Sequence, residues 1–193
     1  MKNLKAIIFD LDGTLIHSAP DMHAAVNATL NTLGRDALDL STIISFIGNG
    51  FEKLVEQSLD ATGRYDNSVR QTALHLYLKS YNQNITTLTR PYTGVVSALR
   101  EFQRAGIPMG ICTNKLTKPA KEICARLDLM QFFKVIAGAE DYQPRKPDPD
   151  SLLNCIKDLS STPSETLYVG DSTIDYFTAL NADVPFRLFS NGY

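Results

Sequence analysis

The stretch KAIIFDLDGTL, from Lys5 to Leu15, decides the fold, because an apolar run leads directly into two acids and a tight turn. The four residues Ala6 to Phe9 are all apolar, which predicts a central parallel strand that is buried on both faces. Asp10 follows at the carboxyl end of that strand, where open α/β sheets bind their ligands. Asp12 comes two residues later, so in an extended chain both carboxylates point to the same side.

Two carboxylates so close together repel each other, and a divalent cation or a shared proton has to hold them. Oxygen ligands beside a charged substrate favour magnesium, which combines one or two carboxylates with water and phosphate oxygens. Taken alone, Asp10 and Asp12 also fit a plain turn, since the Asp12-Gly13 pair is a common turn signal. The other motifs of the chain decide between these two interpretations.

The composition is that of an ordinary globular protein: 193 residues, 44% hydrophobic and 21% charged, with a formal net charge of -2. This balance argues against a general nucleic-acid or membrane-surface binder. The sequence shows no signal-peptide pattern and no apolar run of membrane-spanning length, so we expect a cytoplasmic protein. Cys112, Cys124 and Cys155 each lie in an apolar segment, which predicts reduced, buried thiols.

After Leu15 the hydrophobic period changes from strand to helix for about seventy residues. Four amphipathic helices are expected there: one that Gly34 closes, one from about Ser41, one from Phe51 to Gly63, and one from Val69 to Tyr81. We therefore predict a helical cap at 17–87, inserted into a catalytic core made of 1–16 and 88–193. Between the second and third helices lie Gly48, Asn49 and Gly50, which form either a plain turn or a substrate-binding loop.

From Pro91 onward helices and strands alternate, which predicts a Rossmann-like α/β core with a parallel sheet. Strands are expected at Ile107 to Cys112, Val135 to Gly138, Thr166 to Gly170 and Phe186 to Phe189. The first of these ends in Thr113, Asn114 and Lys115, groups that suit an anion. The simpler alternative is a helix capped by Thr117 beside an exposed Lys115.

Two further motifs carry polar groups. Lys146 stands in the loop RKPDP, whose prolines flank Asp148 and restrict where the lysine points, although a solvated lysine is the usual alternative. Asp171 follows the strand that ends at Gly170, and Asp175 stands four residues later at a helix start. Asp175 either faces the same site or favours the helix dipole. Because parallel strands with right-handed crossovers end at one edge of the sheet, we expect these groups to converge.

In this order, FDLDGTL, ICTN, RKPDP and GDSTID resemble the four motifs of the haloacid dehalogenase superfamily of phosphohydrolases, over essentially the whole chain. SAPD, FIGNG, TRPYTGV and CTNK are similar to the phosphoglycolate phosphatase branch. This resemblance implies a Rossmann-like core with a helical cap, and a magnesium-dependent phosphatase that acts on a small phosphorylated metabolite.

The resemblance also implies a role for each motif residue. Asp10 resembles the nucleophile that forms an aspartyl-phosphate and also binds magnesium. Asp12 resembles the general acid and base, with its backbone carbonyl on the metal. The remaining implied roles are phosphate binding by Thr113 and Asn114, charge neutralisation by Lys146, metal binding by Asp171, and either metal contact or lysine positioning by Asp175.

Two features depart from the family pattern. His17 replaces a commonly acidic residue at the start of the cap, and relatives usually continue beyond Tyr193 with a further helix. If such a helix is missing, we expect apolar groups of the last strand to be exposed and to promote association. The oligomeric state is left as monomer or homodimer.

Other phosphoryl-transfer enzymes of the superfamily remain alternatives: a sugar-phosphate phosphatase, a phosphomutase, a nucleotidase or a pyrophosphatase. A phosphoaccepting receiver domain is a more distant alternative, because receivers place their acid pair and their phosphoaccepting aspartate on different strands and lack a helical insertion. A dehalogenase is disfavoured by Asp12, which hydrolysis of a carbon–halogen bond does not need at that position.

Overall fold

The computed structural model describes residues 4–193 and separates them into two compact units. The larger unit consists of the chain through His17 together with Arg90–Tyr193, and the smaller unit is Ser18–Thr89. The helical segment is therefore an insertion into the larger unit, since the chain leaves that unit after His17 and re-enters it at Arg90. No helix among the described residues is long and apolar enough to cross a membrane.

The boundaries predicted from the sequence, 17–87 for the insertion and 1–16 with 88–193 for the core, fall one or two residues before these limits. Residues 1–3 of the predicted core lie outside the described residues. The role of the insertion as a cap over a substrate stays a prediction.

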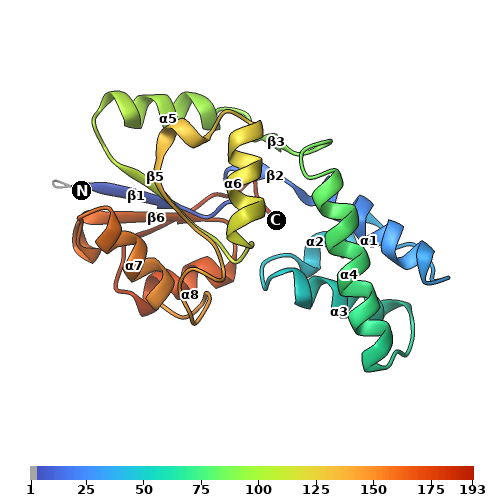
Figure 1. Cartoon of the computed structure of the whole chain (residues 1–193). Helices are drawn as coiled ribbons and strands as arrows, with labels where there is room; N and C mark the ends of the chain where they lie inside the picture. Colours follow the sequence, from blue (N-terminus) through green and yellow to red (C-terminus); the bar gives the residue numbers. More distant parts are fainter. Residues whose placement is uncertain (1–3) are drawn as a thin grey trace. The chain divides into compact units, whose positions relative to one another are not determined.

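The larger unit is built on a parallel sheet (Figure 1). Its strands are β1 (Ala6–Phe9), β4 (Met109–Cys112), β5 (Phe133–Ala137), β6 (Thr166–Gly170) and β7 (Phe186–Leu188). They lie in the order β5-β4-β1-β6-β7, and every neighbouring pair is parallel. The apolar run at the start of the chain is thus the central strand, which confirms the prediction. The chain adds β4 and β5 on one side of β1 and β6 and β7 on the other, so the strand order reverses beside β1.

Helices cover both faces of this sheet. They are α5 (Val95–Arg104), α6 (Thr117–Arg126), α7 (Asp150–Asp158) and α8 (Thr173–Asn181), with short 3-10 turns η1 (Met130–Phe132) and η2 (Pro163–Glu165). Figure 1 shows α5 and α6 on one face and α7 and α8 on the other. This arrangement confirms the Rossmann-like fold class that was predicted from the alternating pattern. Strands covered by helices on both sides are buried on both faces, which explains their continuous apolar runs.

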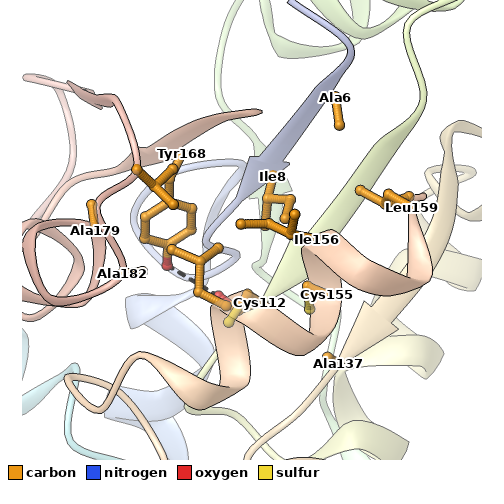
Figure 2. Packing of buried hydrophobic residues seen from close by; sticks show 12 residues of the cluster. Ala6, Ile8, Cys112, Ala137, Cys155, Ile156, Leu159, Tyr168, Ala179 and Ala182 are labelled. Carbon is orange, nitrogen blue, oxygen red and sulfur yellow. Dashed lines mark hydrogen bonds between the residues drawn. The ribbon is translucent and has the colours of Figure 1, made fainter. Parts of the chain in front are cut away.

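Side chains of β1 alternate between the two faces. Ile8 packs into the cluster under α7 and α8, together with Cys155 and Tyr168 (Figure 2). Phe9 points to the opposite face, where its ring centroid lies 6.3 Å from those of both Phe102 and Phe133. Because both faces of β1 are packed, its carboxyl end is held rigidly, and the acid that follows it has a fixed position.

The structure corrects some strand limits. β4 begins at Met109 rather than Ile107, because Pro108 has no N–H for the ladder, although its carbonyl accepts a hydrogen bond from the N–H of Ile7 (3.1 Å). β5 begins at Phe133 rather than Val135. Two short strands were not predicted: β2 (Ile16–His17) and β3 (Arg90–Pro91) pair antiparallel where the chain leaves and re-enters the larger unit. Two residues are too few to produce a recognisable period.

The smaller unit contains the four helices predicted for it: α1 (Ala19–Thr32), α2 (Leu40–Phe46), α3 (Phe51–Thr62) and α4 (Asn67–Gln83). Helix α1 packs mainly against α4 and buries Met22, Val26 and Leu30. Phe51, Tyr77 and Tyr81 form a parallel stack, with ring centroids 6.3 and 5.6 Å apart. Apolar and aromatic burial therefore gives this unit a core of its own.

Asp21 ties the two ends of the smaller unit together. Its buried carboxylate accepts hydrogen bonds from the backbone N–H groups of Leu88 (2.9 Å) and Thr89 (2.8 Å), and from the hydroxyl of Thr89 (2.6 Å). These donors belong to the last residues of the unit, while Asp21 stands in the first turn of α1. One carboxylate thus fixes the exit of the chain against its entry.

We predict that Asp21→Ala lowers the free energy of unfolding by about 2–4 kcal/mol, because it leaves the two buried donors of Thr89 and the N–H of Leu88 without their acceptor. Urea unfolding followed by circular dichroism measures this loss. The matched control, Asp36→Ala, removes an exposed carboxylate and should change stability by less than about 0.5 kcal/mol. Equal stability of the two variants would show that the Asp21 contacts do not hold the unit together.

Candidate active site

Three of the predicted acids meet at the carboxyl ends of β1 and β6. Asp10 directly follows β1, Asp171 directly follows β6, and Asp175 lies in the first turn of α8. One oxygen from each carboxylate lies within 4.8 Å of the others. The convergence expected from parallel strand ends is therefore present, and these acids form a group that could hold a metal ion.

The ammonium of Lys146 lies inside this group. Its Nζ is 2.8 Å from Oδ1 of Asp10, 2.7 Å from Oδ1 of Asp175 and 2.9 Å from the hydroxyl of Tyr168. Only 4% of Lys146 is exposed, so the solvated-lysine alternative is wrong. A buried cation with these partners joins residues from β1, β6, α8 and the loop before α7.

The position of Lys146 is supported through the backbone of its loop. The side-chain amide of Asn114, at the end of β4, donates to the carbonyl of Lys146 (3.1 Å). The amide of Asn181, at the end of α8, donates to the carbonyl of Pro147 (3.0 Å). The loop is thus anchored from two elements, in addition to the restriction that its prolines impose.

Burial controls the ionisation of this group. Burial raises the pKa of Asp10 well above its ordinary value, the negative charges of Asp175 and Asp171 raise it further, and the charge of Lys146 opposes the change. For Asp175, burial also acts to raise the pKa, but the charge and hydrogen bond of Lys146 outweigh it and the pKa is lowered. Burial alone would lower the pKa of Lys146, whereas the charges of Asp10 and Asp175 raise it above its ordinary value. Lys146 therefore stays charged.

Asp171 is held in a narrow space. Its carboxylate accepts hydrogen bonds from the hydroxyl of Thr14 (2.6 Å) and from the N–H of Tyr193 (3.0 Å). Burial raises its pKa despite these bonds. A Cβ on Gly13 or on Gly192 would lie 2.3 Å from atoms of Asp171, so only glycine leaves room for it on these two sides. Gly13 also has a φ of +90°, which favours glycine.

Asp12 has a different partner from Asp10. Nζ of Lys115 lies 2.9 Å from one oxygen and 3.1 Å from the other oxygen of the Asp12 carboxylate. The side chains of Lys115 and Asp12 are only 7% and 10% exposed. The alternative of an exposed Lys115 beside a helix cap at Thr117 is wrong, because Thr117 is the first residue of α6 and the N-cap is Leu116.

The predicted phosphate-binding residues Thr113 and Asn114 are buried at the end of β4. The Thr113 hydroxyl accepts a hydrogen bond from the N–H of Lys115 (3.2 Å), and the Asn114 amide supports the Lys146 loop. The other predicted substrate-binding residues, Gly48, Asn49 and Gly50, belong to the smaller unit, between α2 and α3. Their role in substrate binding stays a prediction.

Sequence reasoning missed Tyr168 and Thr14. The hydroxyl of Tyr168 accepts a hydrogen bond from the ammonium of Lys146 (2.9 Å). Its single proton faces two acceptors, Oδ1 of Asp175 (2.8 Å) and the carbonyl of Cys112 (3.2 Å), and the second of these contacts is drawn in Figure 2. A tyrosine hydroxyl between Leu167 and Val169, two residues before Gly170, was the signal that could have identified it. Thr14 carried no comparable signal, because Gly-Thr is common after an acid in a turn.

The acidic group has the donor chemistry that a hard divalent cation requires. Three carboxylates offer oxygen ligands, and together with the ammonium of Lys146 their formal charges sum to -2. A divalent cation would neutralise this charge, which opposes the burial that chiefly raises the pKa of Asp10 and the repulsion from Asp175 and Asp171 that raises it further. Asp10 and Asp171 are the residues whose side chains would hold it, while Asp175, the third acid of the group, is bound to Lys146.

The chain is similar to known proteins over nearly its whole length. The family model described as haloacid dehalogenase-like hydrolase matches residues 7–189. A phosphoglycolate phosphatase of Cereibacter sphaeroides is 39% identical over 191 residues, which are 98% of this chain and 87% of that protein. A phosphoglycolate phosphatase of Rhodobacter capsulatus is 38% identical over 188 residues, 97% of this chain and 85% of that protein.

Solved structures agree with the fold. A predicted phosphoglycolate phosphatase from Haemophilus somnus 129PT matches with a TM-score of 0.95 and 26% identity, covering 98% of this chain and 87% of that one. A haloacid dehalogenase-like hydrolase from Bacteroides fragilis matches with a TM-score of 0.88 and 28% identity, covering 98% of this chain and 89% of that one.

We predict that magnesium raises the thermal midpoint of the protein, because an ion that binds only the folded state stabilises it. At about 100 times its dissociation constant the gain is about 2.7 kcal/mol, or roughly 5–10 °C for a chain of this size. Differential scanning fluorimetry with and without magnesium measures the shift. Asp171→Asn should lose most of it, while Asp36→Asn, an exposed control, should keep it. An equal shift in both variants would place the ion elsewhere.

Proposed function

The chain belongs to the haloacid dehalogenase-like hydrolase family, and from this premise we propose that it is a magnesium-dependent phosphatase that hydrolyses 2-phosphoglycolate. The observation that carries the proposal is the buried contact of Lys146 with Asp10 at the end of the central strand (2.8 Å). A fixed ammonium beside a carboxylate suits attack on a phosphoryl group, since it offsets negative charge on both reactants. The choice of 2-phosphoglycolate is supported by the names of relatives up to 39% identical.

In the first proposed step, an oxygen of Asp10 attacks the phosphorus of the substrate. A bond between that oxygen and phosphorus forms, the bond from phosphorus to the ester oxygen breaks, and the product alkoxide leaves. Asp12, in its protonated form, gives its proton to the leaving oxygen. The result is an aspartyl-phosphate on Asp10 and a glycolate product whose former ester oxygen is now a hydroxyl.

In the second proposed step, Asp12 takes a proton from a water molecule as that water attacks the phosphorus. The bond between phosphorus and Asp10 breaks, inorganic phosphate is released, and Asp10 returns as a carboxylate. Asp12 is again protonated, so the cycle is closed. One residue serves as acid and then as base, which is consistent with its place two residues from the nucleophile.

Several groups are proposed to stabilise the charge that moves in these steps. Lys146 offsets charge on Asp10 and on the phosphoryl oxygens, and Thr113 and Asn114 bind phosphoryl oxygens from the end of β4. Magnesium, held by Asp10, Asp171 and the Asp12 carbonyl, would supply further positive charge when bound. Asp175 acts as a positioning residue, because it bonds Lys146 at 2.7 Å and also accepts from Ser172.

The insertion Ser18–Thr89 is proposed to act as a cap that excludes water and large substrates, with Gly48, Asn49 and Gly50 contacting the substrate. The partner is then a small phosphorylated metabolite. A cytoplasmic location and a monomeric or homodimeric state stay predictions, and so does the influence of His17 at the junction.

A phosphate-release assay tests this function. We expect magnesium-dependent turnover, with a higher kcat/KM for 2-phosphoglycolate than for hexose phosphates or nucleoside monophosphates. Asp10→Asn should fold but lose at least about 10³-fold in kcat, because an amide cannot attack phosphorus. The exposed control Asp36→Asn should keep full activity.

A clear preference for a sugar phosphate would move the assignment to another phosphatase or a phosphomutase of the family. Substantial turnover by folded Asp10→Asn would contradict the covalent mechanism.

A further inference from the structure

The ion pair between Lys115 and Asp12 has no part in the mechanism above. Both oxygens of the Asp12 carboxylate lie within 3.1 Å of the Lys115 ammonium, and both side chains are nearly buried. The two lysines of the site thus bind different acids. Lys146 binds Asp10 and Asp175, whereas Lys115 binds Asp12.

While it is paired with Lys115, Asp12 cannot act as the proposed general acid and base. To reach the leaving oxygen of a substrate, the Asp12 carboxylate has to turn at least one oxygen away from Lys115. Breaking a buried ion pair without a replacement is strongly unfavourable, because it leaves an uncompensated charge. The exchange becomes easy only if another anion takes the place of Asp12 beside the ammonium.

We propose that Lys115 is a specificity-determining residue that binds a carboxylate of the substrate in exchange for the carboxylate of Asp12. This inference rests on the proposed phosphatase function. The group that Lys115 holds in the free protein is itself a carboxylate, bound through both oxygens, so a substrate carboxylate reproduces the same charge and the same two contacts. Binding of that group releases the Asp12 carboxylate from Lys115, and Asp12 then takes up a proton from solvent and carries it to the ester oxygen.

The exchange couples recognition to catalysis. A phosphate ester with a carboxylate near its ester oxygen satisfies Lys115 and frees Asp12 at the same time. A phosphate ester of the same size without a carboxylate leaves Asp12 bound to Lys115, so it is turned over slowly even when its phosphate is bound. The substrate class selected is therefore the phosphorylated hydroxy acids, and the selection resides in the core rather than only in the cap.

The test compares 2-phosphoglycolate with ethyl phosphate, which has the same two-carbon skeleton but no carboxylate. The readout is the ratio of their kcat/KM values in wild type, in Lys115→Met and in the control Lys118→Met, which removes an exposed lysine three residues away. We expect a wild-type ratio of at least about 30, consistent with truncation of a buried charge partner. The ratio should fall toward 1 in Lys115→Met and stay unchanged in Lys118→Met, while ethyl phosphate turnover stays equal or rises.

If Lys115 only holds Asp12 in place, Lys115→Met lowers kcat/KM equally for both esters, the ratio is unchanged, and the proposal is overturned. Should Lys115→Met not fold, Lys115→Gln provides the same comparison. A second readout is equilibrium binding of 2-phosphoglycolate to Asp12→Asn. Removing the competing carboxylate should tighten binding of 2-phosphoglycolate more than binding of ethyl phosphate, and equal changes would also overturn the exchange.

These outcomes are separate from a failure of the proposed function. If wild type releases no phosphate from any ester with magnesium present, the phosphatase assignment fails and the exchange fails with it. If wild type hydrolyses both esters with a ratio near 1, the phosphatase assignment stands and the role of Lys115 is overturned.

Discussion

The site depends on the contacts that the ammonium of Lys146 makes with two buried acids. This ammonium is buried, and it lies within 2.9 Å of Asp10, Asp175 and Tyr168, which come from β1, α8 and β6. Burial without this cation would drive both acids toward their neutral forms, and the nucleophile proposed here has to be ionised. The loop of Lys146 is anchored to Asn114 and, through Pro147, to Asn181, so the same contact also fixes the end of β4 relative to α8.

The parallel sheet explains why residues so distant in sequence meet. With β1 at the centre and the order reversing beside it, the ends of β4, β1 and β6 lie at one edge. Each strand is packed and mostly apolar, and each is followed at once by a polar residue: Thr113, Asp10 and Asp171. Glycine at 13 and 192 then leaves room for Asp171. The packed strands hold their carboxyl ends in place, and the polar residues that follow these ends form the proposed active site.

The fold class and the convergence of Asp10, Asp171, Asp175 and Lys146 could be predicted because their signals are local: an apolar run followed directly by an acid, or a lysine between prolines. The partner of Asp12 could not, since Lys115 stands 103 residues away and a lysine after a strand is usually solvated. Tyr168 was missed because a tyrosine in a strand normally indicates packing. The paired strands β2 and β3 have only two residues each, which is too short for a period.

Unfolding of Lys146→Met by urea in metal-free buffer, at pH 7 and at pH 5, tests the central role of this lysine most directly. At pH 7 the variant should be about 3–5 kcal/mol less stable than wild type, because Asp10 and Asp175 lose their buried cation. The loss should shrink at pH 5. Wild type keeps at pH 5 the stability that the lowered pKa of Asp175 provides, because that stability is lost only as pH falls below the ordinary pKa of the group. The unpaired buried acids of the variant take up protons as pH falls, so the variant recovers part of its stability. The exposed control Lys157→Met should match wild type. A loss that is absent, or equal at both pH values, would contradict the account.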